Sequence, residues 1–316
     1  MTPFDAWILG IVEGVTEYLP VSSTGHLILT SALLGLDRDP AQAEALKDFE
    51  IIIQGGAILA VLGLYRRRVA QMAGGTIARA RCGLRGVPQD EAARTGWIVA
   101  RNVMIAFLPA AVVALAVKDW VKANLFSPMP VIGALAVGGV IMLAIAPWQS
   151  RRLREEQDAR RLATAAGDLR DQTGVALARM TAGQAAFIGV LQCLALWPGT
   201  SRSLATIVGG LLVGLGGVAA AEFSFLLGLV TLSAASGYSA LKIVKAGEWS
   251  NFVAAVGGWL PLVSGVLVAW ASAALAVDFL VRYLGRHTLA LFGWWRIAVA
   301  ATVLILTWRW GLRIGA

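Results

Sequence analysis

Residues 13–26 read EGVTEYLPVSSTGH and lie within an apolar stretch, residues 3–34, that is too interrupted to cross a membrane as one helix. A second stretch, residues 184–213, is interrupted in the same way by PGTSRS at residues 198–203. Each apolar arm beside a break has about 10 to 17 residues, whereas a spanning helix needs about 20. Irregular backbone survives at membrane depth only where protein or a wet cavity surrounds it. We therefore predict two re-entrant helical hairpins.

Six other segments are apolar and long enough to span a membrane. They cover residues 49–65, 97–117, 129–148, 219–241, 252–277 and 289–308. Of the 316 residues, 58% are hydrophobic and 15% are charged, whereas a soluble domain has about 25% charged residues. This composition excludes an ordinary soluble protein and a disordered chain. The expected fold class is an all-α polytopic membrane protein with six spans and two re-entrant hairpins.

The two halves of the chain resemble each other. GIVEGVTEYLPVSST begins at residue 10 and GVLQCLALWPGTSRS at residue 189, and a one-residue gap aligns Pro20 with Pro198 and Ser23 with Ser201. Each half has one hairpin followed by three spans, so the second copy is expected to be inverted in the membrane. The predicted division is a first repeat at 1–148, a cytoplasmic linker at 149–183, and a second, inverted repeat at 184–316. Within the linker, the polar stretch 151–179 is expected to be either a short cytoplasmic surface helix or a connection between the repeats.

The basic residues lie between the apolar segments and predict the orientation. The net charge is +8, and the segments 66–96, 149–183 and 278–288 contain seven, seven and two arginines. An excess of arginine and lysine marks cytoplasmic loops, so these loops are expected inside and the N-terminus outside. The charge therefore does not indicate a nucleic-acid partner. No basic region precedes the first apolar stretch, and we expect no cleaved signal peptide.

Glu13 and Glu17 are the first candidate functional residues. They are four residues apart and share one helix face. A carboxylate at membrane depth costs about 2.5–3.5 kcal/mol on insertion scales, and two on one face also repel each other. The pair needs a cation, a shared proton or an arginine. The alternative interpretation is a pair at a helix end that only contacts water.

The hydroxyls of Ser22, Ser23 and Thr24 directly precede the second arm of the first hairpin. Such residues cap helices, and the free N–H groups of a helix N-terminus bind anions. Capping alone would also explain them. His26 follows Ser23 by three residues, and a neutral imidazole is a natural base for a serine hydroxyl, although a lone histidine is more often structural.

The second break contains Thr200, Ser201, Arg202 and Ser203. Arginine binds phosphate through two parallel hydrogen bonds and stays charged in a dry site. The alternative is an arginine that only pairs with Glu13 or Glu17. If the two breaks meet, the combined set suits phosphoryl transfer. The carboxylates would repel the phosphate unless a divalent ion bridges them.

Several motifs together resemble the bacterial undecaprenyl-diphosphatase family, which is linked to bacitracin resistance. They are EGVTEYLPVSSTGH, DFEIIIQGGAILAV, WPGTSRS, EFSFLLG and GWWRI, and the likeness covers nearly the whole chain. The resemblance implies hydrolysis of undecaprenyl diphosphate to undecaprenyl phosphate and phosphate, which recycles the lipid carrier of peptidoglycan synthesis. It implies a bacterial inner-membrane enzyme that depends on Mg²⁺ or Ca²⁺ and whose site opens to the periplasm. We also consider a homodimer as the assembly of this protein.

The resemblance also implies a role for each motif residue. Glu13 and Glu17 would be the acidic pair and the metal ligands, Ser23 the nucleophile, His26 its base and Arg202 the phosphate holder. Substrate-binding roles fall on Ser22, Thr24, Gln54, Thr200, Ser201 and Ser203. Two features depart from the family: Leu204 stands where a glycine usually follows SRS, and the loops around 79–94 and 151–179 are longer.

Three alternatives remain open at this point. Inverted repeats and broken helices are also typical of transporters, so a flippase of a polyprenyl phosphate lipid is the principal alternative function. The acid-phosphatase-like lipid phosphatases need a further histidine after their arginine motif, and His287 is the one histidine that follows Arg202 in the sequence. Within the phosphatase reading, water could attack directly while Ser23 only binds phosphate.

Overall fold

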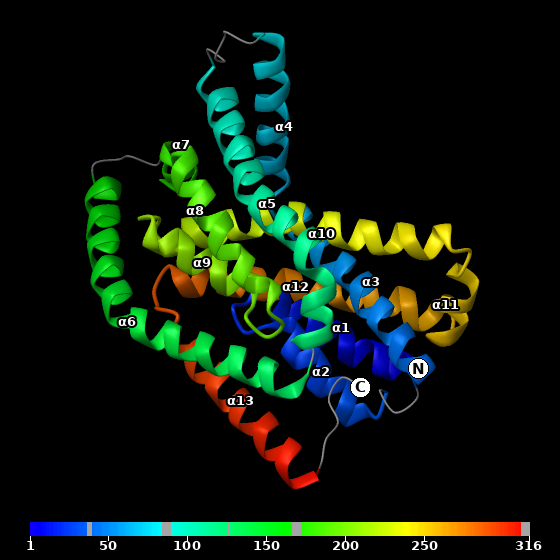
Figure 1. The fold of residues 1–316 in the computed structure, drawn as a ribbon. Coiled ribbons are helices and arrows are strands. Elements are labelled where there is room, and N and C mark those ends of the chain that lie inside the picture. The colour runs from blue at the N-terminus through cyan, green and yellow to red at the C-terminus, as the bar shows by residue number, and fades with distance from the viewer. Residues whose placement is uncertain (37–39, 84–89, 126, 166–171, 311–316) are drawn as a thin grey trace.

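The computed structural model describes the chain except for residues 37–39, 84–89, 126, 166–171 and 311–316, and every regular element in the described part is a helix (Figure 1). The first half contains α1 (Pro3–Tyr18), α2 (Ser23–Leu34), α3 (Pro40–Leu64), α4 (Arg66–Arg81), α5 (Glu91–Asn124) and α6 (Pro128–Ala165). The second half contains α7 (Gln172–Arg179), α8 (Ala182–Gln192), the 3₁₀ helix η1 (Cys193–Leu196), α9 (Arg202–Leu212), α10 (Gly217–Lys245), α11 (Trp249–Ala255), α12 (Trp259–Leu284) and α13 (Ala290–Trp310).

Five of these helices are long and apolar enough to cross a bilayer: α5, α6, α10, α12 and α13. Two bent pairs pass the same test, α3 with α4 at 77° and α7 with α8 at 97°. A bilayer satisfies no backbone polar groups, and helices satisfy their own. The chain is therefore an all-helical, multi-pass membrane protein.

Each of the two interrupted apolar stretches forms two helices joined by a short turn. The first turn connects α1 to α2 and the second connects η1 to α9. Ser22 and Ser201, with φ of 76° and 75°, are the two non-glycine residues of positive φ in the described chain. Both are N-caps: Ser22 Oγ accepts a hydrogen bond from Gly25 N at 3.4 Å and Ser201 Oγ from Leu204 N at 3.3 Å. The two turns thus have the same backbone conformation at the serine that caps the following helix.

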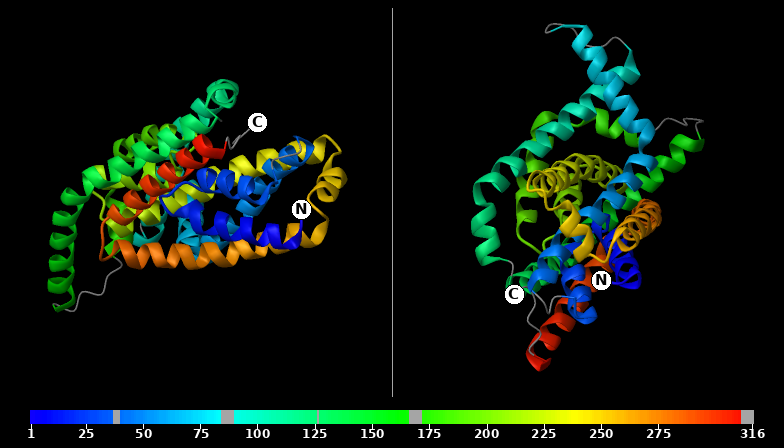
Figure 2. Two further views of the ribbon diagram at one scale, coloured as in Figure 1. Left: turned by 90° about the horizontal axis from the view of Figure 1, so that it is seen from below. Right: turned by 90° about the vertical axis from the view of Figure 1, so that its right-hand side faces the viewer.

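Three expected boundaries differ from the observed helices. The segment 252–277 is divided, because Gly257 and Gly258 adopt φ of 91° and 98° between α11 and α12, a conformation that ends a helix. The expected loop 66–96 is mainly helical: α4 and the start of α5 form an antiparallel pair that projects from the rest of the molecule (Figures 1 and 2). In the expected linker 149–183, α6 continues to Ala165 and α7 follows, while residues 166–171 lie outside the described part.

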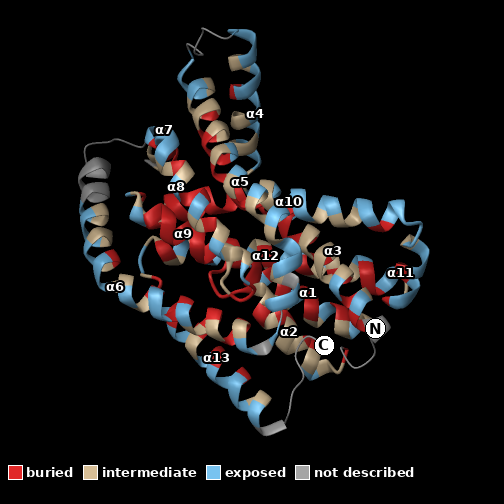
Figure 3. Cartoon of the chain, in the orientation of Figure 1, coloured by how far each residue is buried: buried red, intermediate tan, exposed pale blue. Residues whose placement is uncertain are grey.

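Helix α12 packs closely against both α1 and α3, and this packing fixes the helix that carries Glu13 and Glu17. A Cβ atom on Gly10 would lie 3.3 Å from Ala269 N, and one on Gly14 would overlap the backbone oxygen of Ala269. A Cβ on Gly56 of α3 would likewise overlap α12. Small residues permit such close approach of helices in membranes. Buried residues are concentrated on α9 and on the first half of α10, which pack against each other (Figure 3).

Candidate active site

The two turns face a common cavity of about 150 Å³. Its lining comes from both interrupted stretches and from the two helices beside them, α3 and α10. The lining residues are Glu17, Ser22, Ser23, Thr24, Gln54, Ala195, Trp197, Pro198, Gly199, Ser201, Arg202 and Leu232. Side chains that lie far apart in the sequence, including six of the predicted site residues beyond Glu17, therefore meet in one polar cleft.

Glu17 is the centre of the contacts in this cleft. Ser23 Oγ donates a hydrogen bond to Glu17 Oε2 at 2.6 Å, and Arg202 Nη2 lies 3.4 Å from Glu17 Oε1. Both charged side chains are largely buried, with 6% and 9% of their surface exposed. An ion pair in this setting offsets part of the desolvation cost of each charge. The expected pairing of Arg202 with an acidic residue is therefore observed with Glu17.

Arg202 is held from several sides. Nη1 donates to the backbone oxygen of Ser224 at 2.9 Å, and the guanidinium lies 5.4 Å from the centre of the Tyr18 ring. A Cβ atom at Gly228 would overlap this guanidinium, so the EFSFLLG segment of α10 provides the space for it. Nε of Arg202 is buried without a hydrogen-bond partner among the described residues. One N–H donor of the Arg202 guanidinium therefore makes no hydrogen bond to the described residues.

Glu13 lies one helical turn from Glu17 and outside the cleft lining. It is 1% exposed, it hydrogen-bonds Gln54, and its Oε1 has no partner in the described structure. Gln54 is itself oriented by Ser236, whose hydroxyl donates to Gln54 Oε1 at 2.9 Å. Two buried carboxylates beside one arginine leave excess negative charge. Their oxygens are the ligands that Mg²⁺ and Ca²⁺ prefer, so the residues present fit a divalent cation.

This fit rests on two carboxylates only. The described residues contain no group of three or more histidine, cysteine, aspartate or glutamate side chains placed to hold a metal ion. Mg²⁺ commonly binds through one or two carboxylates together with water and substrate phosphates. The donor set at Glu13 and Glu17 corresponds to that kind of site rather than to a complete protein cage.

His26 does not contact Ser23 as the sequence interpretation expected. Its Nδ1 lies 2.8 Å from the backbone oxygen of Ser22, and its Nε2 accepts a hydrogen bond from the Trp295 indole N–H at 2.9 Å. The two rings are parallel within 5° at a centroid distance of 6.1 Å. Both ring nitrogens are thus engaged away from Ser23. In this arrangement the Ser23 hydroxyl donates its hydrogen bond to the carboxylate of Glu17 instead.

Some of the remaining predicted residues line the cleft, and the others form hydrogen bonds within or between the two turns. Ser22, Thr24 and Ser201 line the cleft. Ser203 is fully buried and its hydroxyl donates to the backbone oxygen of Leu19 at 2.9 Å, which links one turn to the other. Thr200 lies in the second turn, where its N–H donates to Trp197 O at 3.1 Å.

Several residues at or near the site were not anticipated as site residues. Trp197 lines the cleft and donates through its indole N–H to Pro130 O at 3.0 Å. Ser224 holds Arg202, Ser236 holds Gln54 and Trp295 holds His26. Polar residues inside the apolar run of α10 were a usable signal for the two serines. The partner of His26 depends on packing between distant helices and left no local signal.

Both α2 and α9 begin at the cleft. The first N–H groups of a helix have no partner within the helix, and the helix dipole adds positive potential there. Two such N-termini together with Arg202 form a strong site for an anion such as phosphate. The positive φ of Ser22 and Ser201 costs of order 1–3 kcal/mol at each turn, and it directs the N-termini of both helices toward the cleft that these serines line.

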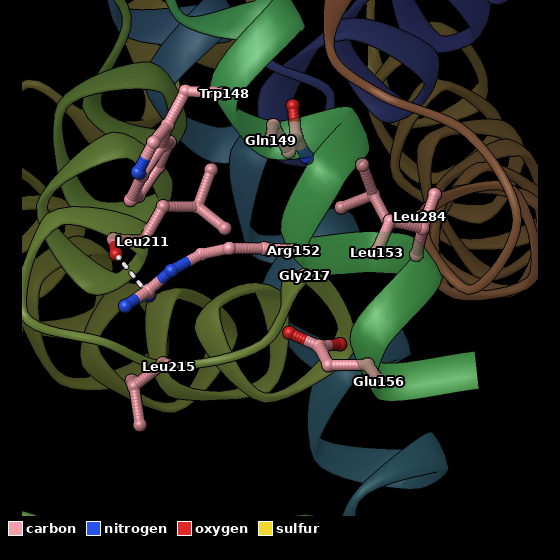
Figure 4. A pocket seen from close by; sticks show the side chains of 9 residues that line it. All are labelled: Trp148, Gln149, Arg152, Leu153, Glu156, Leu211, Leu215, Gly217 and Leu284. Atoms are coloured by element: carbon pink, nitrogen blue, oxygen red, sulfur yellow. Dashed lines mark hydrogen bonds between the residues drawn. The ribbon is translucent and has the colours of Figure 1, made fainter. Parts of the chain in front are cut away.

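A second pocket lies where the continuation of α6 contacts the α9–α10 connection (Figure 4). Its volume of about 10 Å³ is enough for one water molecule. Arg152 stacks 4.8 Å from the Trp148 ring and donates to Leu211 O at 3.4 Å. None of the predicted site residues lines this pocket, which we interpret as a packing contact.

The fold and the cleft define the class of protein: a multi-pass membrane protein in which two helix breaks meet at one polar cleft that contains Arg202 and Glu17. The chain belongs to the family described as bacitracin resistance protein BacA, whose family model matches residues 6–302. Similar proteins include an undecaprenyl-diphosphatase of Sorangium cellulosum, 44% identical over 96% of this chain and 86% of that protein. An undecaprenyl-diphosphatase of Methylibium petroleiphilum is 40% identical, and undecaprenyl-diphosphatase 2 of Rhodospirillum rubrum 41%; each match covers 96% of this chain and 94% of the relative.

Proposed function

We propose that this chain is an integral membrane phosphatase that hydrolyses undecaprenyl diphosphate to undecaprenyl phosphate and phosphate, and so recycles the lipid carrier of peptidoglycan synthesis. The observation that carries the proposal is the cluster of Ser23, Glu17 and Arg202 where the two turns meet. The names of the relatives agree with it. A transporter needs no serine hydrogen-bonded to a buried carboxylate.

The proposed reaction uses groups from both turns. Arg202 and the N-termini of α2 and α9 bind the diphosphate. Ser23 Oγ attacks the terminal phosphorus while its proton passes to Glu17 Oε2, and the bond from phosphorus to the bridging oxygen breaks. Undecaprenyl phosphate leaves. Water then attacks the phosphoserine phosphorus and leaves with it as dihydrogen phosphate, while Glu17 returns its proton to Ser23 Oγ as the bond from Oγ to phosphorus breaks. Positioning and charge neutralisation supply most of the acceleration.

We include a divalent cation, Mg²⁺ or Ca²⁺, in the proposal. The carboxylates of Glu13 and Glu17 would hold it, and the unpartnered Oε1 of Glu13 supports this assignment. When bound, the cation would neutralise charge on the phosphates and allow them to approach the carboxylates. Gln54 would keep Glu13 oriented, since it contacts both Glu13 and Ser236.

The proposed membrane layout has six spans, α3, α5, α6, α10, α12 and α13, with α1–α2 and α8–α9 as re-entrant hairpins. The matching backbone of the turns at Ser22 and Ser201 supports an inverted repeat. The repeats would comprise residues 1–148 and 184–316, joined by the linker 149–183. The arginines of α4 and the end of α6 would face the cytoplasm of a bacterial inner-membrane protein, which leaves the cleft open to the periplasm.

The test is phosphate release from a C15 or C55 isoprenyl diphosphate by the detergent-purified protein. Ser23→Ala should lose nearly all activity, whereas Ser264→Ala should match the parent because its hydroxyl bonds only within α12, to Leu260 O and Pro261 O. Absence of phosphate release from folded parent protein supplied with Mg²⁺ or Ca²⁺ would overturn the proposal. Lipid movement across liposomes without phosphate release would instead indicate a flippase. Full activity of Ser23→Ala would assign the attack to water.

A further inference from the structure

Arg296 on α13 is the largest side chain in the described structure that is fully buried, with 0% exposure. A buried cation in a membrane protein costs several kcal/mol, so a merely space-filling role would be met better by an apolar residue. Its hydrogen bonds show what it contacts. Nε donates to Leu135 O at 3.2 Å and Nη2 donates to Ala134 O at 2.9 Å, both on α6.

The other hydrogen bonds of Arg296 reach the two turns of the cleft. Nη1 donates to Pro20 O at 3.4 Å in the first turn, and Nη2 donates to Gly199 O at 2.8 Å in the second. One guanidinium therefore contacts the backbone of both turns and of α6. Pro20 lies three residues before Ser23, and Gly199 lies three residues before Arg202. The contacts thus lie equally close in sequence to the nucleophile and to the phosphate-binding group.

We propose that Arg296 is a positioning residue that sets the separation of the two turns, and thereby the distance from Ser23 to a phosphate held by Arg202. The inference rests on the proposed phosphatase function and adds to it a residue outside the cleft lining. The planar guanidinium of arginine, with five N–H donors, is needed to make these four hydrogen bonds. A lysine has one ammonium group, which cannot reach four carbonyl oxygens in three segments. Ser203, which donates to Leu19 O at 2.9 Å, is a second link between the turns.

The space for this fork comes from a glycine on α6. A Cβ atom at Gly138 would overlap Arg296 Nη2, lie 2.7 Å from Arg296 Cζ and lie 2.8 Å from Leu204 Cδ2, whereas a Cβ at Gly133 of the same helix meets nothing within 4 Å. Gly138→Ala would therefore displace the guanidinium, together with the end of the Leu204 side chain, without altering Arg296. Gly133→Ala is the matched control, because it makes the same chemical change on the same helix.

The experiment measures kcat, KM and thermal unfolding for Arg296→Lys, Arg296→Gln, Gly138→Ala and Gly133→Ala. A misplacement of about 1 Å can cost 10²-fold in rate, so Arg296→Lys and Gly138→Ala should lose at least tenfold in kcat. KM should change less than threefold, because Arg202 keeps its hydrogen bond to Ser224 O in these variants. Arg296→Lys should unfold within a few degrees of the parent, which separates positioning from stability, and Gly133→Ala should match the parent throughout.

Combining Gly138→Ala with Arg296→Lys gives the decisive comparison. If Gly138→Ala acts by displacing Arg296, the double variant should lose no more kcat than Arg296→Lys alone. Losses that multiply, or a native kcat in Arg296→Lys, would overturn the inference. If Arg296→Gln fails to fold, the other variants still decide. An inactive parent would refute the proposed function, whereas an active parent with an active Arg296→Lys would refute only the role of Arg296.

Discussion

Replacing Glu17 with glutamine tests the proposed proton acceptor directly. Glutamine keeps the size of the side chain and an oxygen that can accept from Ser23 Oγ, which now lies 2.6 Å from Glu17 Oε2. It removes the negative charge that would take the proton and that pairs with Arg202 at 3.4 Å. The substitution therefore keeps the hydrogen bond but removes the charge that would accept the proton and help to hold the metal ion, so kcat is measured at saturating Mg²⁺ or Ca²⁺.

Two magnitudes follow from these contacts. General base catalysis contributes about 10²–10⁴-fold, so Glu17→Gln should lower kcat at least 100-fold, which is about 2.7 kcal/mol. Loss of one partner from a buried ion pair typically costs about 3–5 kcal/mol of stability. Arg202 keeps the Ser224 oxygen at 2.9 Å and the face of Tyr18, so we expect a stability loss of about 3 kcal/mol, the lower end of this range.

Glu222→Gln is the matched control. Glu222 and Glu17 are each 7% exposed, and Glu222 also accepts from an arginine, Arg68 Nε, at 2.7 Å. It lies two residues before Ser224, whose backbone oxygen accepts from Arg202, but its own carboxylate pairs with Arg68 and does not line the cleft. Both variants should therefore lower the unfolding temperature, while kcat for phosphate release falls only in Glu17→Gln. A folded Glu17→Gln enzyme that keeps more than a tenth of kcat would refute proton transfer to Glu17.

Three further predictions concern the metal, the packing and the orientation. EDTA should abolish phosphate release, excess Mg²⁺ or Ca²⁺ should restore it, and Glu13→Gln should raise the half-saturating metal concentration at least tenfold; an unchanged requirement in an active variant would exclude Glu13 as a ligand. Gly56→Ala should lower the unfolding temperature by overpacking α3 against Val266 O, at a cost of about 1–3 kcal/mol, whereas Gly55→Ala meets nothing within 4 Å; equal losses would contradict this packing. In a Cys193→Ala variant, the exposed Cys82 is the one cysteine that remains. It should react with an impermeant maleimide only after the inner membrane is permeabilised. Labelling in intact spheroplasts would show that the proposed orientation is wrong.

The sequence predicted the two helix breaks, because both combine polar residues with apolar arms too short to span, and it left their meeting as a condition that the common cleft fulfils. It could not predict the partner of His26, since Trp295 lies on α13 and reaches α2 only through tertiary packing. The same holds for Arg296, whose carbonyl partners carry no side-chain signature. The helical continuation of α6 beyond residue 149 is easier to predict from the sequence, because alanine, arginine and glutamate are strong helix formers.

The division of chemistry between the two turns follows from their electrostatics. The turns share the positive φ of Ser22 and Ser201, yet the first stretch carries the carboxylates and the second carries Arg202. At the position that aligns with Glu13, the second stretch has Gln192, which is neutral. Two acidic turns would repel each other in a low-dielectric interior, whereas opposite charges favour the approach that Glu17 and Arg202 show. The charge asymmetry thus favours the contact between the two turns and places a cation next to carboxylates, which is the arrangement that the proposed binding of a diphosphate and a divalent cation uses.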